Sequence, residues 1–253
     1  MKWLFLIFAS LILSACEQEP EGAPSSVKEP PSVATAIGSQ ALGANFPLLP
    51  VIEPRLWTKL TAAEKALESG NASASGEVER ISAKLNERHP FRMGEEFIEL
   101  GEVRYDKESG RFSLPAVMCY PREGDARHPG ELELLLCTET GRTHETLLTS
   151  TARPLHLELL MHLVGKPRGP EGAKFRAEIR SSAGSTVSVE QLVADQNGEP
   201  WPQPLIFEFS GSEFGELYSP DLTGDFAIFW HAHDSVLRIT DQGIANGETK
   251  LRP

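Results

Sequence analysis

Basic residues are scarce in this sequence. It has 24 lysines and arginines against 36 aspartates and glutamates, which gives a formal net charge of −12 at pH 7. A nucleic-acid partner requires a basic face that meets the phosphates, so this balance excludes nucleic acid as the expected ligand. It also argues against electrostatic docking on an anionic lipid surface. Any attachment to a membrane would therefore need something other than charge.

Long apolar runs are nearly absent as well. The main one is Leu4 to Leu13, which follows the short positive start Met1-Lys2-Trp3. The run is too short to span a bilayer and has the length of a signal-peptide core. The chain is thus expected to leave the cytosol, with no transmembrane helix later in the sequence.

The residues Leu13-Ser14-Ala15-Cys16 end this run and resemble the bacterial lipobox. In such precursors the cysteine takes a diacylglycerol, the chain is cut before it, and the new amine is acylated. The resemblance implies a lipoprotein signal peptide over residues 1–15 and lipidation of Cys16. Each buried CH2 of the acyl chains contributes about 0.8 kcal/mol, so the anchor would hold without a spanning helix. The alternative is an ordinary signal peptide with a chance cysteine.

Residue 17 is Glu rather than Asp. By resemblance to Gram-negative lipoproteins, in which Asp at this place favours retention in the inner membrane, we expect the periplasmic face of the outer membrane. Removing residues 1–15 removes Lys2 and no acid, so the net charge goes from −12 to −13.

Cysteine is rare, with only Cys119 and Cys137 beyond Cys16. Disulfides persist where exported proteins fold, so this pair could form a bridge. The alternative is two buried thiols that act as small apolar side chains. A catalytic or redox thiol is the third interpretation.

Composition divides the mature chain into three parts. Residues 16–47 begin with the lipidated cysteine and are rich in Pro, Ser and Glu, which predicts a disordered tether. Residues 48–90 are Pro-broken and should hold two short helices. The first is predicted from the capping box Thr61–Glu64 to about Leu67, and the second over residues 77–88 from the helical spacing of its apolar residues.

The third part, residues 91–253, is predicted as a single α+β, mainly β domain, rich in antiparallel sheet, with one well-defined buried helix. That helix starts at Pro154 and stops before Gly165, and it is apolar on almost every side. About eight segments with strand composition surround it. The segment "EFIELGEVRYD" is expected to form a hairpin with "RFSLPAVMCY" across the turn "KESG".

Two blocks of this part resemble the YdjY-type domain of bacterial exported proteins. One runs from "FSLPA" through "GELELLLCTETGRTHETLLTSTARPLHLELLMHLVGKPRGPEG", and the other is "FEFSGSEFGELYSPDLTGDFAIFW". Together the similarity covers roughly residues 91–239. It implies a fold and a cell-envelope setting but no established reaction. The family helix usually carries a His where this chain has Glu158, with His156 two residues earlier.

Candidate ligand residues fall in three places. His144-Glu145 follows a turn at the start of a predicted strand, where neighbouring side chains point to opposite faces. Glu158 and His162 are four apart on the helix, which suits either an ion pair or two metal ligands. In a strand, His231 and His233 would share one face and could bind Zn or Cu if His144 or Glu145 supplied a third ligand, whereas in a turn they would only cap a loop.

Common catalytic motifs are missing. There is no Gly-x-Ser-x-Gly elbow, phosphate loop or dinucleotide fingerprint. We therefore expect a lipid-anchored, non-enzymatic envelope module that binds a protein, a peptide or a surface component. The alternative is a metal-binding protein or metal-dependent enzyme that uses His144, Glu145, His231 and His233.

Overall fold

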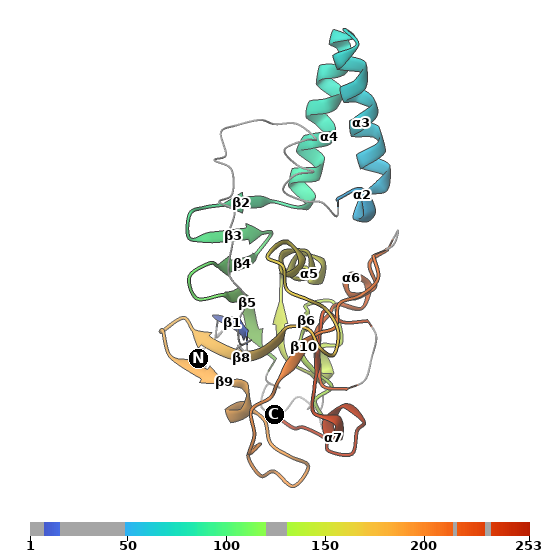
Figure 1. The fold of residues 1–253 in the computed structure, drawn as a ribbon. Coiled ribbons are helices and arrows are strands. Elements are labelled where there is room, and N and C mark those ends of the chain that lie inside the picture. Colours follow the sequence, from blue (N-terminus) through green and yellow to red (C-terminus); the bar gives the residue numbers. More distant parts are fainter. Residues whose placement is uncertain (1–7, 16–48, 120–130, 215–216, 231–233) are drawn as a thin grey trace, which may run out of the picture. The chain divides into compact units, whose positions relative to one another are not determined.

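A computed structural model describes residues 8–15, 49–119, 131–214, 217–230 and 234–253 (Figure 1). These residues fall into two compact units. One unit contains the helices up to Glu87, and the other joins the strand over residues 8–15 to Arg88–Pro253. No helix within the described ranges is long and apolar enough to cross a bilayer.

The helical unit contains α2 (Leu49–Ile52), α3 (Pro54–Glu68), the 3-10 turn η1 (Ala72–Ala74) and α4 (Ser75–Arg88). The predicted second helix is confirmed as α4. The prediction that the first helix begins at Thr61 is wrong, because Pro54 occupies the first turn and starts α3 there. The Thr61 hydroxyl donates to the Trp57 carbonyl oxygen at 3.1 Å inside the helix instead of capping it.

Eight strands of the other unit form a closed ring in the order β1, β8, β10, β12, β11, β6, β7 and β5, because β1 pairs with both β8 and β5. Neighbours are antiparallel except for the pairs β6–β7 and β11–β12. The bounds of these strands are β1 Phe8–Ala15, β5 Arg111–Met118, β6 Leu134–Thr138, β7 Thr146–Ser150, β8 Lys174–Ser181, β10 Phe207–Phe209, β11 Asp225–Ile228 and β12 Leu237–Ile239. The mainly β class with helices is confirmed, whereas closure of the sheet was not predicted.

Further strands extend the sheet beyond the ring. β4 pairs with β5, β3 with β4 and β2 with β3, while β9 pairs with β8. The remaining elements are β2 Phe91–Met93, β3 Phe97–Leu100, β4 Val103–Asp106, η2 Thr143–Glu145, α5 Pro154–Leu163, β9 Thr186–Ser188, η3 Val189–Leu192, α6 Ser219–Thr223 and α7 Gln242–Ala245.

The predicted strand "EFIELGEVRYD" is two strands, β3 and β4, joined by a turn at Gly101. Gly101 has φ +59°, and a Cβ there would lie 2.1 Å from Nδ1 of His156. The turn therefore needs glycine both for its left-handed backbone and for the close approach of the helix residue. The alternation of the segment predicted a single strand, and this glycine breaks it.

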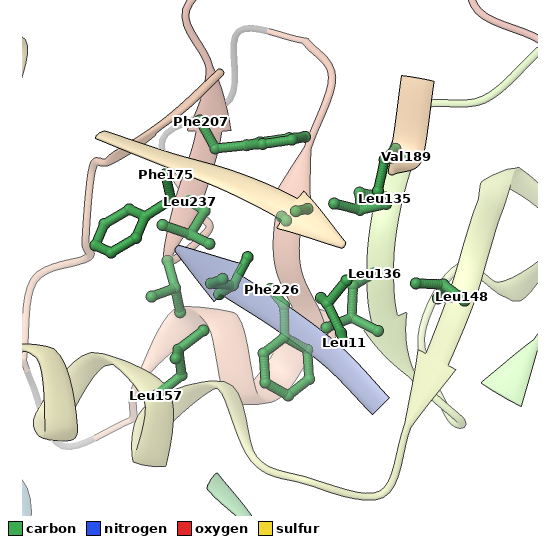
Figure 2. Close-up of a cluster of buried hydrophobic side chains, with 14 of the residues drawn as sticks. Leu11, Leu135, Leu136, Leu148, Leu157, Phe175, Val189, Phe207, Phe226 and Leu237 are labelled. Carbon is green, nitrogen blue, oxygen red and sulfur yellow. The ribbon is translucent and has the colours of Figure 1, made fainter. Parts of the chain in front are cut away.

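The apolar core lies inside the ring and includes the buried face of α5 (Figure 2). The predicted helix is confirmed as α5, and residues 154–161 of it are buried. Close-packed side chains surround Leu11 of β1, as the close-up shows for Phe226 and Leu136, and Phe175 belongs to the same cluster. Burial of this kind contributes about 25 cal/mol per Å² of apolar surface, which makes the core the main stabilising term of the domain.

Strand β1 consists of residues that the sequence predicts as a signal peptide. Leu11 and Leu13 are fully buried, while Ser10, Ile12 and Ser14 on the other face are partly exposed. This alternation has the period of two that a half-buried strand requires. The same eight residues thus satisfy the composition of a targeting segment and the pattern of a core strand.

The two cysteines of the domain are free thiols, so the predicted disulfide between Cys119 and Cys137 is not formed. Cys119 follows β5 and Cys137 lies in β6, and both strands flank β7. Strands two places apart are separated by about 10 Å, whereas disulfide-linked Cα atoms lie within about 7 Å. Burial raises the pKa of the Cys137 thiol to about 12, which suits a small apolar side chain and not a reactive thiolate.

Candidate functional site

One polar cluster is organised around Arg142, at the start of η2. Its Nη1 lies 2.8 Å from Oε2 of Glu133 and 3.3 Å from Oε2 of Glu145, and its Nη2 lies 3.1 Å from Oδ2 of Asp225. The guanidinium also lies 5.9 Å from the ring centre of Trp230. We call these five residues the Arg142 cluster. It ties the chain before β6, the turn η2 and the start of β11 together.

The Arg142 cluster holds more negative charge than its single guanidinium can balance. Burial raises the pKa of Glu133, and the neighbouring Glu145 carboxylate raises it further. Burial also raises the pKa of Asp225, although Arg142 opposes the shift. Oδ1 of Asp225 is buried and has no hydrogen-bond partner among the described residues. Both shifts favour the protonated form of these two carboxyl groups.

His144 lies at the edge of this cluster. The prediction that His144 and Glu145 point to opposite faces of a strand is wrong, because both lie in η2, and β7 begins only at Thr146. The tight turn brings Nε2 of His144 to 3.1 Å from Oε1 of Glu145. The His144 side chain is 63% exposed, so it is accessible from solvent.

Glu158 belongs to a separate, buried cluster. Its carboxylate is 0% exposed and accepts hydrogen bonds from the Ser212 backbone N–H at 3.1 and 2.9 Å and from the Tyr218 hydroxyl. Nε2 of His162 lies 3.6 Å from the same carboxylate, so the predicted contact between the two helix residues is confirmed. Arg168 approaches to 3.9 Å. The buried carboxyl group is therefore surrounded by donor groups, as burial of such a polar group requires.

Gly211 allows this arrangement. It has φ +61°, and a Cβ there would lie 2.8 Å from Oε1 of Glu158. Only glycine leaves room for the backbone to run beside the Glu158 carboxylate. This close approach brings the Ser212 N–H within hydrogen-bonding distance. A cavity of about 450 Å³ opens beside this loop and is lined by Arg168, Gly169, Ser210, Gly211, Ser212, Glu213, Ser219, Asp234 and Arg238.

The sequence-predicted ligands do not converge on one metal centre within the described ranges. His144 and Glu145 contact the Arg142 cluster, whereas Glu158 is bonded to Ser212 and Tyr218. His231 and His233 lie outside the described residues. Among the described residues, no group of three or more His, Cys, Asp or Glu side chains could hold a metal ion.

A third feature is a buried histidine pair. Nε2 of His156 lies 3.3 Å from Nδ1 of His89 and 3.1 Å from the carbonyl oxygen of Arg88. Burial lowers the pKa of His156 to about 3, with smaller contributions from Arg153 and His89. His156 is therefore neutral at physiological pH and ties α5 to the residues before β2.

Sequence reasoning missed the partners that complete both clusters. Arg142 and Asp225 are 83 residues apart, and Glu158 and Tyr218 are 60 apart. No local pattern reports contacts of this kind. The one available hint was the strongly apolar surroundings of Glu158 in its helix, since a carboxylate buried there must find donors elsewhere.

Comparisons with known proteins found no relative of this chain. The chain matches no protein-family model, no curated protein and no solved structure.

The bond between Glu158 and Tyr218 can be tested by a double-mutant cycle. We expect Tyr218→Phe to lower the free energy of unfolding by about 1.5 kcal/mol and Glu158→Gln by about 2 kcal/mol, because each leaves a buried polar partner unsatisfied. The double variant should lose less than the sum, with a coupling of about 1 kcal/mol. Urea unfolding measures all four proteins. The half-buried Tyr105 provides the matched control, and a loss in Tyr105→Phe equal to that in Tyr218→Phe would contradict the assignment.

The buried His156 predicts a specific acid sensitivity. Between about pH 6.5 and pH 3 the unfolded state binds a proton that the folded state does not, so stability falls on acidification by at most about 1.4 kcal/mol per pH unit. The His156→Gln variant cannot titrate and should lose this slope between pH 7 and pH 5. Urea midpoints across that range measure it. His144→Gln, at an exposed histidine, should keep the parent slope, and identical slopes in all three proteins would refute the prediction.

Proposed function

We propose that this protein is a lipid-anchored cell-envelope protein with a YdjY-like domain that acts as a non-enzymatic binding module. The observation that carries the anchor is Leu13-Ser14-Ala15-Cys16 directly after a short apolar run with a positive start. In this proposal residues 1–15 are removed and Cys16 carries the acyl chains. The protein then lies at the periplasmic face of the outer membrane if the cell is Gram-negative.

The composition of the chain supports this setting. Residues 17–47 are rich in Pro, Ser and Glu and have few large apolar side chains, as in tethers that separate a domain from its anchor. The mature chain carries a net charge of −13 by the arithmetic above, which favours solubility and excludes nucleic acid as the partner. The partner that fits is a protein or peptide of the envelope.

The arrangement of polar groups supports a binding role rather than a reaction. Glu158 accepts hydrogen bonds from Ser212 and Tyr218, and three carboxylates of the Arg142 cluster share one guanidinium. Catalytic groups need a free, positioned donor, acceptor or nucleophile facing a reacting atom. Side chains engaged in this way stabilise loops around the sheet and leave the surface of the sheet as the place for a partner.

Lipidation has a direct test. In cells fed labelled palmitate, we expect the wild-type chain to incorporate label and the purified protein to have the mass of residues 16–253 plus a diacylglycerol and an acyl chain. A Cys16→Ser variant should remain unlabelled and unprocessed, because the thiol is the site of the first transfer. Cys119→Ser should label like the parent. A Cys16→Ser chain that is processed and fractionates normally would overturn the anchor.

A metal-binding role is the second candidate. It is favoured by the contact between His144 and Glu145. These residues would supply imidazole and carboxylate ligands that suit Zn or Cu.

Metal analysis separates the two candidates. A binding module should purify with far less than one Zn or Cu per chain and should unfold at the same temperature with and without chelator. Stoichiometric metal that is lost in both His144→Ala and His233→Ala would instead establish the metal-binding role. Asp195→Ala, at an exposed turn, provides the matched control.

A further inference from the structure

The position of β1 has a consequence for the mature protein, and this step rests on the proposed removal of residues 1–15. β1 lies antiparallel to both neighbours, with seven paired positions against β5 and seven against β8. When it is removed, Arg111–Val117 of β5 and Phe175–Ser181 of β8 become two facing strand edges. We call the space between them the β1 slot.

We infer that the β1 slot of the mature protein binds an extended segment of an envelope polypeptide by strand addition, and that the segment carries two apolar residues at alternate positions followed by an acidic residue. Each step of this inference comes from the pairing of β1 itself. Strand addition supplies main-chain hydrogen bonds on both edges, and side-chain pockets give the preference for sequence.

The inner side of the slot selects apolar residues. Leu11 of β1 pairs with Leu114 and Ile179, and Leu13 pairs with Phe112 and Ala177. All four partners are at most 6% exposed, and so are Leu11 and Leu13. An occupant must therefore place two apolar side chains two residues apart, because a slip of one residue would bring polar side chains into the core.

The outer side of the slot selects negative charge. Ser14 pairs with Arg111 on one side and with Arg176 on the other, and both arginine side chains are exposed. Neither arginine forms an ion pair with a described residue in this structure. An acidic residue at the position of Ser14 would face two cations across the ladder, and opposite charges in such cross-strand pairs are stabilising.

The flanking strands have features of natural sheet edges. β5 contains Pro115, which has no N–H to donate to a ladder. β8 alternates buried residues with Arg176, Glu178 and Arg180 on its outer face. Charges and proline are the usual devices that keep an exposed edge from pairing indiscriminately. The two strands are both antiparallel to β1 and so parallel to each other, and closing the ring without an occupant would require a new parallel pairing between them.

The test uses the lipidated mature protein in non-ionic detergent and a fluorescent peptide of residues 8–15. Fluorescence anisotropy should show saturable, one-to-one binding. The peptide with Ser14→Glu should bind about fivefold more tightly than the peptide with Ser14→Lys, as expected for two cross-strand charge pairs. The peptide with Leu11→Asp and Leu13→Asp should bind at least about tenfold more weakly than the parent peptide, because both side chains enter the core.

Protein variants locate the site. The exchange Arg111→Glu with Arg176→Glu should reverse the preference between the Glu and Lys peptides. Lys84→Glu, an exposed position of α4, changes one charge in the same direction and should leave the preference unaltered. In hydrogen exchange, the amides of β5 and β8 should gain protection when the parent peptide binds.

Two results would overturn the inference. One is absence of peptide binding while the β5 and β8 amides of the mature protein exchange slowly, which would mean that the slot is already closed. The other is binding that ignores both the Leu→Asp changes and the Arg→Glu changes. The mass of the native protein distinguishes these failures from failure of the anchor, because a chain that keeps residues 1–15 and carries no lipid would refute the proposed function before any peptide is added.

Discussion

This structure depends on one constraint that a closed sheet imposes. Every strand of the ring must turn its apolar side chains inward, and these inward residues must pair with the inward residues of the neighbouring strands. β1 meets the constraint through Leu11 and Leu13, which face buried residues on both neighbours. The ring is complete only because this strand pairs on both sides. The inward faces of β5 and β8 supply Phe112, Leu114 and Phe175 to the same core. The stability of the ring thus depends on what occupies a single strand position.

The residues of β1 are subject to two physical demands. An export machine recognises a short apolar run with a positive start, and a sheet recognises alternation with a period of two. The segment "FASLILSA" satisfies both, because the buried Leu11 and Leu13 alternate with Ser10, Ile12 and Ser14 inside a stretch that remains apolar on average. Under the proposed function export acts first, since the amino terminus emerges before β5 and β8 are made. Folding in the envelope would then proceed on a chain from which the strand has been removed, and the β1 slot follows from that order of events.

Local patterns predicted the elements that depend on local chemistry. The buried helix at Pro154–Leu163 followed from a proline at its start and a glycine after its end. The failures have equally specific causes. Gly101 divided a predicted strand, η2 placed His144 beside Glu145, and β7 separated the two cysteines. Each of these three features depends on a turn or on the order of the strands in the sheet. The hydrophobic pattern of one segment encodes neither turns nor strand order. The salt bridge between Arg142 and Asp225 joins residues 83 apart in the sequence, so a local pattern does not encode it either.

The state of Glu158 bears on how the domain can act. A buried carboxylate is stable only when donors replace the water it has lost, and here a backbone N–H and a tyrosine hydroxyl do so, with the His162 ring and the Arg168 guanidinium farther away. The Tyr218 pKa is raised by burial first and by this carboxylate second, so the hydroxyl remains a donor. Glu158 therefore fixes α5 to the loop that contains Gly211 through these hydrogen bonds. Under the proposed function, removal of residues 1–15 would leave the facing edges of β5 and β8 without their hydrogen-bonding partner.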